Sequence, residues 1–205
     1  MFTQDQSAPE ADPAAAPAPK AGRAALLKAH TSALHERLDA RIMSLEPFAD
    51  RDRYGRFLRV QYRFQDAVEA GIDAATLAPF VPDLAERRRL HLIARDIADL
   101  GLEAPAAEPV ARLATPAEML GWLYVAEGST LGAAFLAKEA QKLGLDGSFG
   151  ARHLAPHPGG RGRHWRRFTQ ALDAAPLGAD GDALAAAAAA AAFVHVRDLV
   201  EAELA

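Results

Sequence analysis

Apolar residues recur every three or four positions through most of the 205-residue chain, which is the spacing of one face of an α-helix. In the first such stretch Leu27, Leu34 and Leu38 share a face and Pro47 follows it, so we expect a helix over about 22–44. The same spacing predicts further helices over about 52–70, 83–101, 115–143, 161–174 and 180–204. No useful stretch alternates between apolar and polar residues, and the sequence therefore predicts an all-α fold.

The segments between these helices are short or rich in turn-forming residues. Asp83 is expected to cap the helix that ends at Gly101. Residues 74–79 are ambiguous, and residues 102–114 are predicted to form a linker. Residues 145–160 are rich in Gly, Pro and His and are predicted to form a long loop.

The helix predicted over 115–143 has the clearest boundaries in the chain. Thr115 can serve as its cap, Pro116 suits the first helical position, and Glu118 completes a capping box three residues after the threonine. Gly144 then provides a residue that can adopt the left-handed conformation with which many helices end. We therefore expect one long, largely apolar helix.

Three glycines interrupt that helix, at 121, 128 and 132, and each costs about 1 kcal/mol relative to alanine. Gly128 and Gly132 are four residues apart, so they share a helix face that carries no side chain. Spacing alone favours a close helix–helix crossing at this face. The alternative is that a flat or bulky ligand approaches the backbone here.

Composition and charge narrow the class of protein. Residues 1–20 are rich in Pro and Ala and are expected to be a disordered tail, which leaves residues 21–205 as one domain. The net charge of −4 gives no support to nucleic-acid binding. The chain lacks cysteine, which excludes disulfides and thiolate metal ligands. It also lacks an uninterrupted apolar run of about 18 residues and an apolar signal core, so we expect no membrane span, a cytoplasmic location and, by default, a monomer.

His35 is the most informative polar residue of the first helix, because it lies at the margin of the apolar face beside Leu34. A lone histidine at such a position usually has a structural role, and His30 lies five residues away on another face, which makes the two a poor metal-binding pair. Lys28 lies two turns before His35 on the same side, about 10 Å along the axis. This pair would suit a ligand with a metal at its centre and a carboxylate at its edge.

Two segments, LLKAHTSALHERLDA (residues 26–40) and GWLYVAEGSTLGAAFLAKEA (residues 121–140), together resemble the heme oxygenase family, most closely its bacterial biliverdin-producing branch. The resemblance extends over residues 24–200 and implies a single-domain helical bundle with heme between a proximal and a kinked distal helix. It implies that His35 ligates the heme iron. It also implies that Gly128, Ser129 and Gly132 belong to the distal helix over the opposite heme face.

The resemblance implies further roles around the heme. A distal face of bare glycine backbone would let the helix approach the heme and direct bound oxygen towards the porphyrin edge. Protons would arrive through ordered water held by backbone carbonyls and a small hydroxyl such as that of Ser129. The animal enzymes of the family carry aspartate at the position of Ser129, so the proton-relay residue of this chain stays open.

The heme propionates need cationic partners. Lys28 matches a propionate-binding lysine of the family, and Trp165 with Arg166 resembles its aromatic–arginine pair. Phe193 resembles a residue of the pocket wall. The other arginines of the helix over 161–174, and the second basic cluster at 86–89, are expected on the surface, where they could attract an acidic electron donor such as a ferredoxin or flavodoxin, itself supplied by its reductase.

Three functions are therefore compared. The first is a heme oxygenase that uses O2 and a reductant to open heme to biliverdin, with release of iron and CO. The second is a non-catalytic heme carrier or sensor on the same fold, which retention of Gly128 and Gly132 disfavours because a pure binder needs no bare distal helix. The third, an all-α regulator that binds nucleic acid through residues 161–167, is disfavoured by the acidic net charge.

Overall fold

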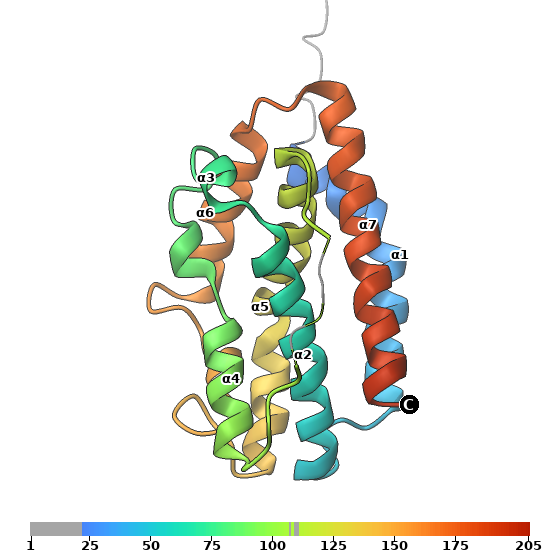
Figure 1. The fold of residues 1–205 in the computed structure, drawn as a ribbon, viewed down its shortest axis with the longest axis vertical. Coiled ribbons are helices and arrows are strands. Elements are labelled where there is room, and N and C mark those ends of the chain that lie inside the picture. The colour runs from blue at the N-terminus through green and yellow to red at the C-terminus, as the bar shows by residue number, and fades with distance from the viewer. Residues whose placement is uncertain (1–21, 107, 109–110) are drawn as a thin grey trace, which may run out of the picture.

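The computed structural model describes residues 22–106, 108 and 111–205, so the predicted disordered tail lies outside the described residues. The described part is helical, with only isolated β-bridges around Asp146 and no β-strand. Its α-helices are α1 (Arg23–Ser44), α2 (Arg51–Gly71), α3 (Ala74–Leu77), α4 (Leu90–Asp99), α5 (Pro116–Lys142), α6 (Arg161–Ala174) and α7 (Gly178–Glu203). Two short 3-10 helices, η1 (Leu84–Arg87) and η2 (Arg152–Leu154), complete the set (Figure 1). The all-α prediction is confirmed.

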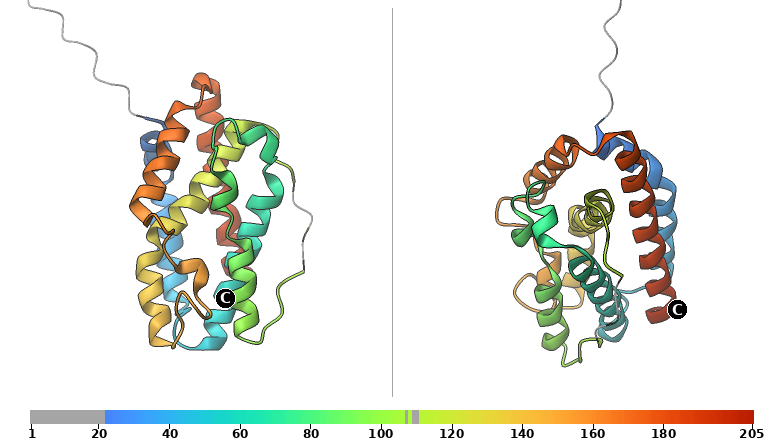
Figure 2. Two further views of the ribbon diagram at one scale, coloured as in Figure 1. Left: turned by 90° about the vertical axis from the view of Figure 1, so that its left-hand side faces the viewer. Right: turned by 45° about the horizontal axis from the view of Figure 1, so that its top comes forward.

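Helix α5 lies in the middle of the bundle and the other long helices surround it (Figure 2). It packs most extensively on α7, while α1 packs on α7, and α2 packs on both α4 and α7. In Figure 1, α1, α5 and α7 all begin at the upper end and run downwards, so these three helices are parallel. Fully buried apolar side chains fill the space between the helices; the largest are Tyr54, Phe57, Phe168, Leu27, Leu58, Leu77, Ile93, Ile97, Met119, Leu120, Leu145 and Leu172.

The ends of α5 form as its sequence predicts. The Thr115 hydroxyl accepts from the Glu118 N–H, and the Glu118 carboxylate accepts from the Thr115 N–H at 2.9 Å, which is the capping box. At the other end Gly144 has φ +74°, and the Leu145 N–H donates to the Ala140 carbonyl.

Gly121 is the glycine that permits a close helix crossing. A Cβ at this position would lie 2.4 Å from the Ala185 carbonyl oxygen and 2.8 Å from the Ala188 Cβ, both on α7. The alanine run of α7 supplies the complementary small surface, since Ala185, Ala189 and Ala192 are fully buried. Helices α5 and α7 can therefore pack against each other at short range.

Within the described residues, α7 is the one helix long and apolar enough to meet the criterion for crossing a membrane. In its most apolar window, 44% of the residues are buried inside the protein. A core helix of a globular bundle meets the same criterion by composition, and the alanines of α7 occupy that position against α5 and α1.

The helix predicted over 83–101 is wrong in its first half. The chain instead forms η1, then extended residues, and then α4 from Leu90. Asp83 does not cap a helix with its side chain; both of its carboxylate oxygens accept from the Arg87 guanidinium at 2.8 Å. Arg87 also donates to Glu127 of α5 at 2.7 Å, a long-range contact that local spacing does not indicate.

The loop after α5 is held against α4 by a buried carboxylate. Asp96 accepts from the His153 backbone N–H at 2.9 Å and lies 2.8 Å from His153 Nδ1. The Tyr54 hydroxyl of α2 donates to the Gly150 carbonyl at 2.9 Å. These contacts fix a segment that is short of apolar residues and lead the chain back towards α6.

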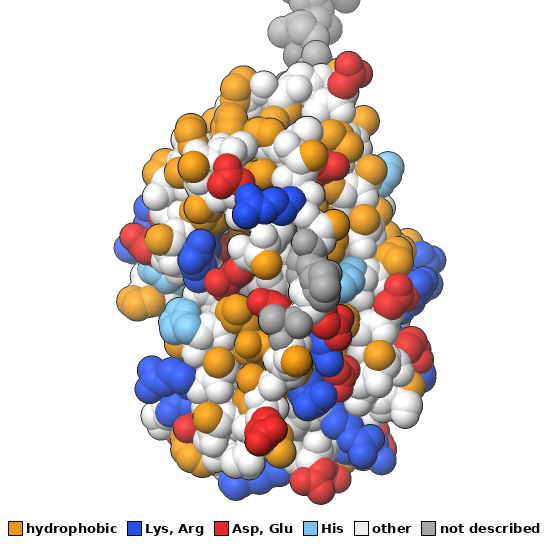
Figure 3. Space-filling view, viewed as in Figure 1, with side chains coloured by type: hydrophobic (Ala, Val, Ile, Leu, Met, Phe, Trp, Pro, Cys, Tyr) orange, Lys and Arg blue, Asp and Glu red, His pale blue; other side chains and the backbone are white. Residues whose placement is uncertain are grey.

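Ion pairs join the helices near the surface. Arg63 of α2 donates to Glu203 at 2.7 Å in a partly buried pair, and Arg41 of α1 donates twice to Glu201 of α7 in an exposed one. In Figure 3, Lys/Arg and Asp/Glu side chains are interspersed towards the lower right. Pairs of this kind contribute little each to stability.

Candidate functional site

His35 stands on α1 with its ring held on two sides. Its Nδ1 lies 3.2 Å from an Asp39 carboxylate oxygen, one turn further along the helix. The Phe193 ring of α7 meets the imidazole edge to face, with ring centroids 5.9 Å apart. The His35 side chain is nevertheless 57% exposed. Because Asp39 engages Nδ1, Nε2 is the nitrogen left to bind a metal.

The position of His35 relative to α5 follows from a contact one turn earlier. Thr31 is buried and lies beside Tyr124 of α5. Burial raises the pKa of Tyr124, and the contact with the Thr31 side chain partly offsets this rise. Since α1 and α5 run in the same direction, His35 and Gly128 each lie one turn beyond this contact. The histidine and the glycine are therefore at the same level on two neighbouring helices.

The shared glycine face of α5 faces open space. In the described structure, a Cβ at Gly128 or at Gly132 would meet no heavy atom within 4 Å. The close helix crossing that spacing favours at these two glycines is therefore wrong, and a close crossing occurs at Gly121 instead. The alternative, a ligand that approaches the bare backbone, stays a prediction.

Large apolar side chains continue this open side of α5. Leu131 is 37% exposed and Phe135, one turn further, is 54% exposed. Ser129 is also exposed, and its hydroxyl donates to the Ala126 carbonyl of the preceding turn at 2.7 Å. Its proton is therefore engaged by the helix itself, while the oxygen can still accept a hydrogen bond.

The two predicted propionate partners come from different helices. Lys28 is exposed on α1, and Arg166 is exposed on α6. The Ala24 N–H of α1 donates to the Asp173 carboxylate of α6 at 2.8 Å, and α6 runs opposite to α1 in Figure 1, so Arg166 lies two turns down α6 from this contact. Trp165, beside Arg166, packs on Tyr124 with centroids 5.6 Å apart. The structure thus places Lys28 on α1 two turns before His35, and Arg166 on α6, which meets α1 at the start of that helix.

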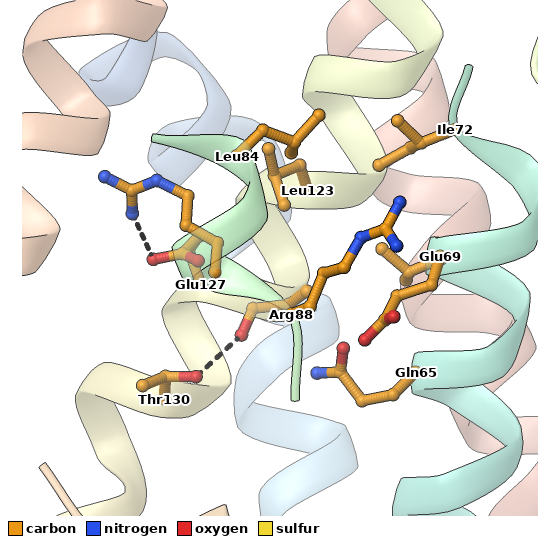
Figure 4. Close-up of a pocket in the computed structure, with 11 residues that line it drawn as sticks. Gln65, Glu69, Ile72, Leu84, Arg88, Leu123, Glu127 and Thr130 are labelled. Carbon is orange, nitrogen blue, oxygen red and sulfur yellow. Dashed lines mark hydrogen bonds and ion pairs between the residues drawn. The ribbon is translucent and has the colours of Figure 1, made fainter. Parts of the chain in front are cut away.

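Two hollows lie away from this site. One, of about 600 Å³, lies beside α4 and is lined by basic side chains that include Arg88, Arg95 and Arg152. The other is a cavity of about 20 Å³ on the far side of α5, bordered by Gln65 and Glu127 (Figure 4). Neither hollow is lined by His35 or the open glycines.

The predicted surface cluster at 86–89 is partly wrong. Arg87 is buried, and it donates to Glu127 of α5 at 2.7 Å. Arg89 is half-buried and donates to the His153 carbonyl at 2.9 Å, and burial lowers its pKa. Arg161 of α6 likewise donates to the Thr130 carbonyl. These arginines are therefore held by carbonyl and carboxylate groups from distant parts of the chain, and they have a structural role.

Sequence reasoning missed two features of the site. One is Asp39, whose i, i+4 spacing from His35 is a detectable signal for a carboxylate–imidazole pair. The other is Glu127, which is buried directly before Gly128 and contacts Arg87 and His164. Its partners lie 40 and 37 residues away, so no local pattern indicates them.

These features together fit a flat metal-containing ligand with acidic edge groups. One imidazole nitrogen is available for the metal, a bare and partly apolar helix face lies at the same level, and two cations lie near the end of the site. In the described part of the chain no group of three or more His, Asp or Glu side chains is arranged to hold a metal ion. A metal that brings its own ring of ligands needs only one from the protein. Fold and site thus describe an all-helical protein whose geometry suits a ligand of this kind.

Comparison with known proteins identifies the family. The heme oxygenase family model matches residues 22–202. Heme oxygenase PigA of Pseudomonas aeruginosa is 45% identical over 173 residues, which is 83% of this chain and 87% of that protein. The chain belongs to the heme oxygenase family, and it is an enzyme of heme cleavage.

Solved structures agree with this assignment. The NO- and CO-bound heme oxygenase of Neisseria meningitidis superposes with a TM-score of 0.85 at 40% identity, covering 89% of this chain and 92% of that chain. The heme oxygenase of Leptospira interrogans shares the fold, with a TM-score of 0.71 at 17% identity over 87% of this chain and 98% of that chain.

Proposed function

We propose that this heme oxygenase binds heme between α1 and the open glycine face of α5, with His35 as the iron ligand. The reaction uses O2 and reducing equivalents and yields biliverdin, iron and CO. When bound, heme supplies both the iron at which O2 is activated and the porphyrin edge that is oxidised. The protein supplies the ligand, the position and the protons.

The observation that carries this proposal is the pairing of His35 with Gly128 and Gly132. A single imidazole with Nδ1 engaged by a carboxylate stands at the level of a helix face on which an added Cβ meets nothing within 4 Å. A side chain at either glycine would occupy the space above a bound heme. The bare backbone therefore lets α5 lie close to the heme and restrict the direction in which bound oxygen can point.

Asp39 and Phe193 have distinct roles in holding His35. The carboxylate lies 3.2 Å from Nδ1, where its charge favours the tautomer with the proton on Nδ1 and a basic Nε2, and so raises the electron donation of the ring. The Phe193 ring restricts rotation of the imidazole from the α7 side. Nε2 is then presented in one orientation, and less of its rotational freedom has to be lost on binding.

Ser129 and the backbone of α5 serve proton delivery in this proposal. The Ser129 hydroxyl donates to Ala126, so its oxygen is free to accept a hydrogen bond from an ordered water. Such a water can pass protons towards bound oxygen without an acidic side chain over the heme. Ser129 thus orients water and does not titrate.

Lys28 and Arg166 are proposed to bind the heme propionates. They approach from α1 and α6, so the propionate edge of the heme would point towards the end of the bundle where these two helices meet. A guanidinium can bind a carboxylate in a bidentate manner, which would fix heme rotation more firmly than the lysine does.

The electron donor is proposed to be a small acidic protein such as a ferredoxin or flavodoxin with its reductase. Arg163 and Arg166 are exposed on α6 beside the proposed heme edge and could attract this acidic donor.

We further propose that residues 21–205 form one heme oxygenase domain, which acts in the cytoplasm as a monomer. A carrier or sensor function is not favoured, because heme binding alone does not require the open glycine face.

His35→Ala tests the proposal. The variant is expected to lose the absorption spectrum of histidine-ligated heme and to fall to background turnover with O2 and reductant. The matched control is His30→Ala, an exposed histidine on the same helix, which is expected to keep both. Unchanged heme spectrum and turnover in His35→Ala would overturn the assignment of the ligand.

A further inference from the structure

Four ionisable side chains form a buried ion cluster behind the distal part of α5: Asp83, Arg87, Glu127 and His164. The side chains of Arg87, Glu127 and His164 are 4% exposed or less. They come from η1, α5 and α6, three elements that are far apart in the sequence. Figure 4 shows a dashed line from the carboxylate of Glu127, whose partner is the Arg87 guanidinium at 2.7 Å.

Arg87 is the centre of this cluster. Its Nη1 donates to Glu127 at 2.7 Å, and its Nε and Nη2 donate to the two oxygens of Asp83 at 2.8 Å. His164 Nε2 lies 3.1 Å from the same Nη1 and 3.3 Å from the Glu127 carboxylate. The guanidinium also lies 5.4 Å above the Phe168 ring of α6. One cation thus ties α5 to η1 and α6 at a single point.

Glu127 is the residue directly before Gly128, and this adjacency suggests what the cluster does. On the glycine face of α5 no side chain of the described protein supports Gly128 or Gly132. The position of this part of the helix must therefore be set from its other face. Glu127 supplies a buried ion pair there, beside the hydrogen bond from Arg161 to the Thr130 carbonyl, whereas Gly121, nearly two turns earlier, is where α5 is pressed against α7.

A buried ion cluster is a poor way to gain stability, since desolvation of the charges offsets most of their attraction. It is directional, however, because the bidentate contact with Asp83 fixes the plane of the Arg87 guanidinium, and Nη1 then points at the Glu127 carboxylate. We propose that the buried ion cluster positions the Gly128–Gly132 backbone over the heme, and that it thereby determines which edge of the porphyrin is attacked. This proposal rests on the proposed function for its second part only.

Glu127→Gln tests it, because the variant keeps the shape of the side chain and removes its charge. In the heme-free protein we expect the amide hydrogens of Gly128 and Ser129 to exchange roughly tenfold faster, while those of Leu120 and Leu123 are unchanged. With heme and reductant we expect a changed ratio of biliverdin isomers and an unaltered spectrum of histidine-ligated heme. A role in stability alone would alter neither the isomer ratio nor the local pattern of exchange.

A second variant guards against misfolding. Arg87→Met with Glu127→Met removes the central pair together, and Asp83 keeps its contact with Arg167 at 3.4 Å, so the variant should stay folded. It is expected to show the same faster exchange and altered isomer ratio. Glu203→Gln, which removes a partly buried charge that pairs with Arg59 and Arg63 on another side of the bundle, is the matched control and should change neither.

The two parts of the proposal can fail separately. Unchanged exchange at Gly128 in both variants would overturn the positioning role. Faster exchange with an unaltered isomer ratio would overturn the link to the site of attack. If the unmodified protein formed no biliverdin, the proposed function would fail, and exchange in the heme-free protein would still decide whether the cluster positions α5.

Discussion

At the scale of the residue, the imidazole of His35 is fixed by two neighbours that do different work. The Asp39 carboxylate engages Nδ1 at 3.2 Å, and the Phe193 ring limits rotation from α7. Burial raises the pKa of Asp39 and His35 opposes this effect, as expected for a carboxylate that faces an imidazole at a partly covered surface. The proposed ligand His35 therefore acts together with Asp39.

Removal of the carboxylate should weaken that ligand. In Asp39→Ala we expect heme affinity to fall by about tenfold, the low end of the range for outer partners of a metal ligand, because Asp39 is exposed. The iron–histidine stretching frequency should fall as well, since Nε2 becomes a weaker donor. Heme titration and resonance Raman spectroscopy measure the two effects. Asp198→Ala, an exposed carboxylate on α7, is the control, and equal behaviour of both variants would contradict the role of Asp39.

At the scale of the element, α5 carries glycines with opposite purposes. Gly121 makes room for α7, where a Cβ would lie 2.4 Å from a backbone oxygen. Gly128 and Gly132 leave room for something outside the fold, because a Cβ there would meet nothing within 4 Å. A single helix thus combines a packing glycine with two glycines of the candidate site.

Alanine substitutions should separate these purposes. Gly121→Ala is expected to destabilise the heme-free protein by about 1–3 kcal/mol through overpacking against Ala185. Gly128→Ala should raise its stability by up to about 1 kcal/mol, because alanine favours the helix, and should weaken heme binding. Chemical denaturation and heme titration give the two numbers. A loss of stability in Gly128→Ala as large as in Gly121→Ala would contradict the assignment.

Much of α5 could be predicted from the sequence because its signals are local. The Thr115–Glu118 capping box and the left-handed Gly144 need only neighbouring residues. The different roles of Gly121 and Gly128 could not be predicted from local sequence, since the two differ only in the tertiary contacts of their helix face. The helix predicted from Asp83 failed for the same reason, because Arg87 is engaged by Glu127, 40 residues further along.

At the scale of the whole molecule, the Asp96–His153 pair couples stability to pH. Burial lowers the pKa of His153 and outweighs Asp96, so the ring is neutral in the fold. Burial would raise the pKa of Asp96, but the hydrogen bonds from His153 lower it more and keep the carboxylate ionised. Below pH about 6.5 the unfolded chain binds a proton that buried His153 does not, so stability falls with pH. The contribution of Asp96 is lost only below pH about 4.

We therefore expect the free energy of unfolding to fall as the pH drops from 7 to 5. His153→Gln keeps a donor for Asp96 and removes the titrating ring, so it should flatten this fall by about 1 kcal/mol. His91→Gln, an exposed histidine of α4, is the control. Urea denaturation at several pH values is the measurement, and an equal pH slope in His153→Gln and the unmodified protein would contradict the coupling.

The central claim is that the histidine of α1 and the bare face of α5 together cleave heme. The most direct test is a visible absorption time course of the protein with hemin in air, after addition of ascorbate or a ferredoxin system. The account predicts loss of the Soret band and growth of a broad band in the red, with biliverdin found by chromatography. A stable Soret band, or no spectral response to hemin at all, would contradict it.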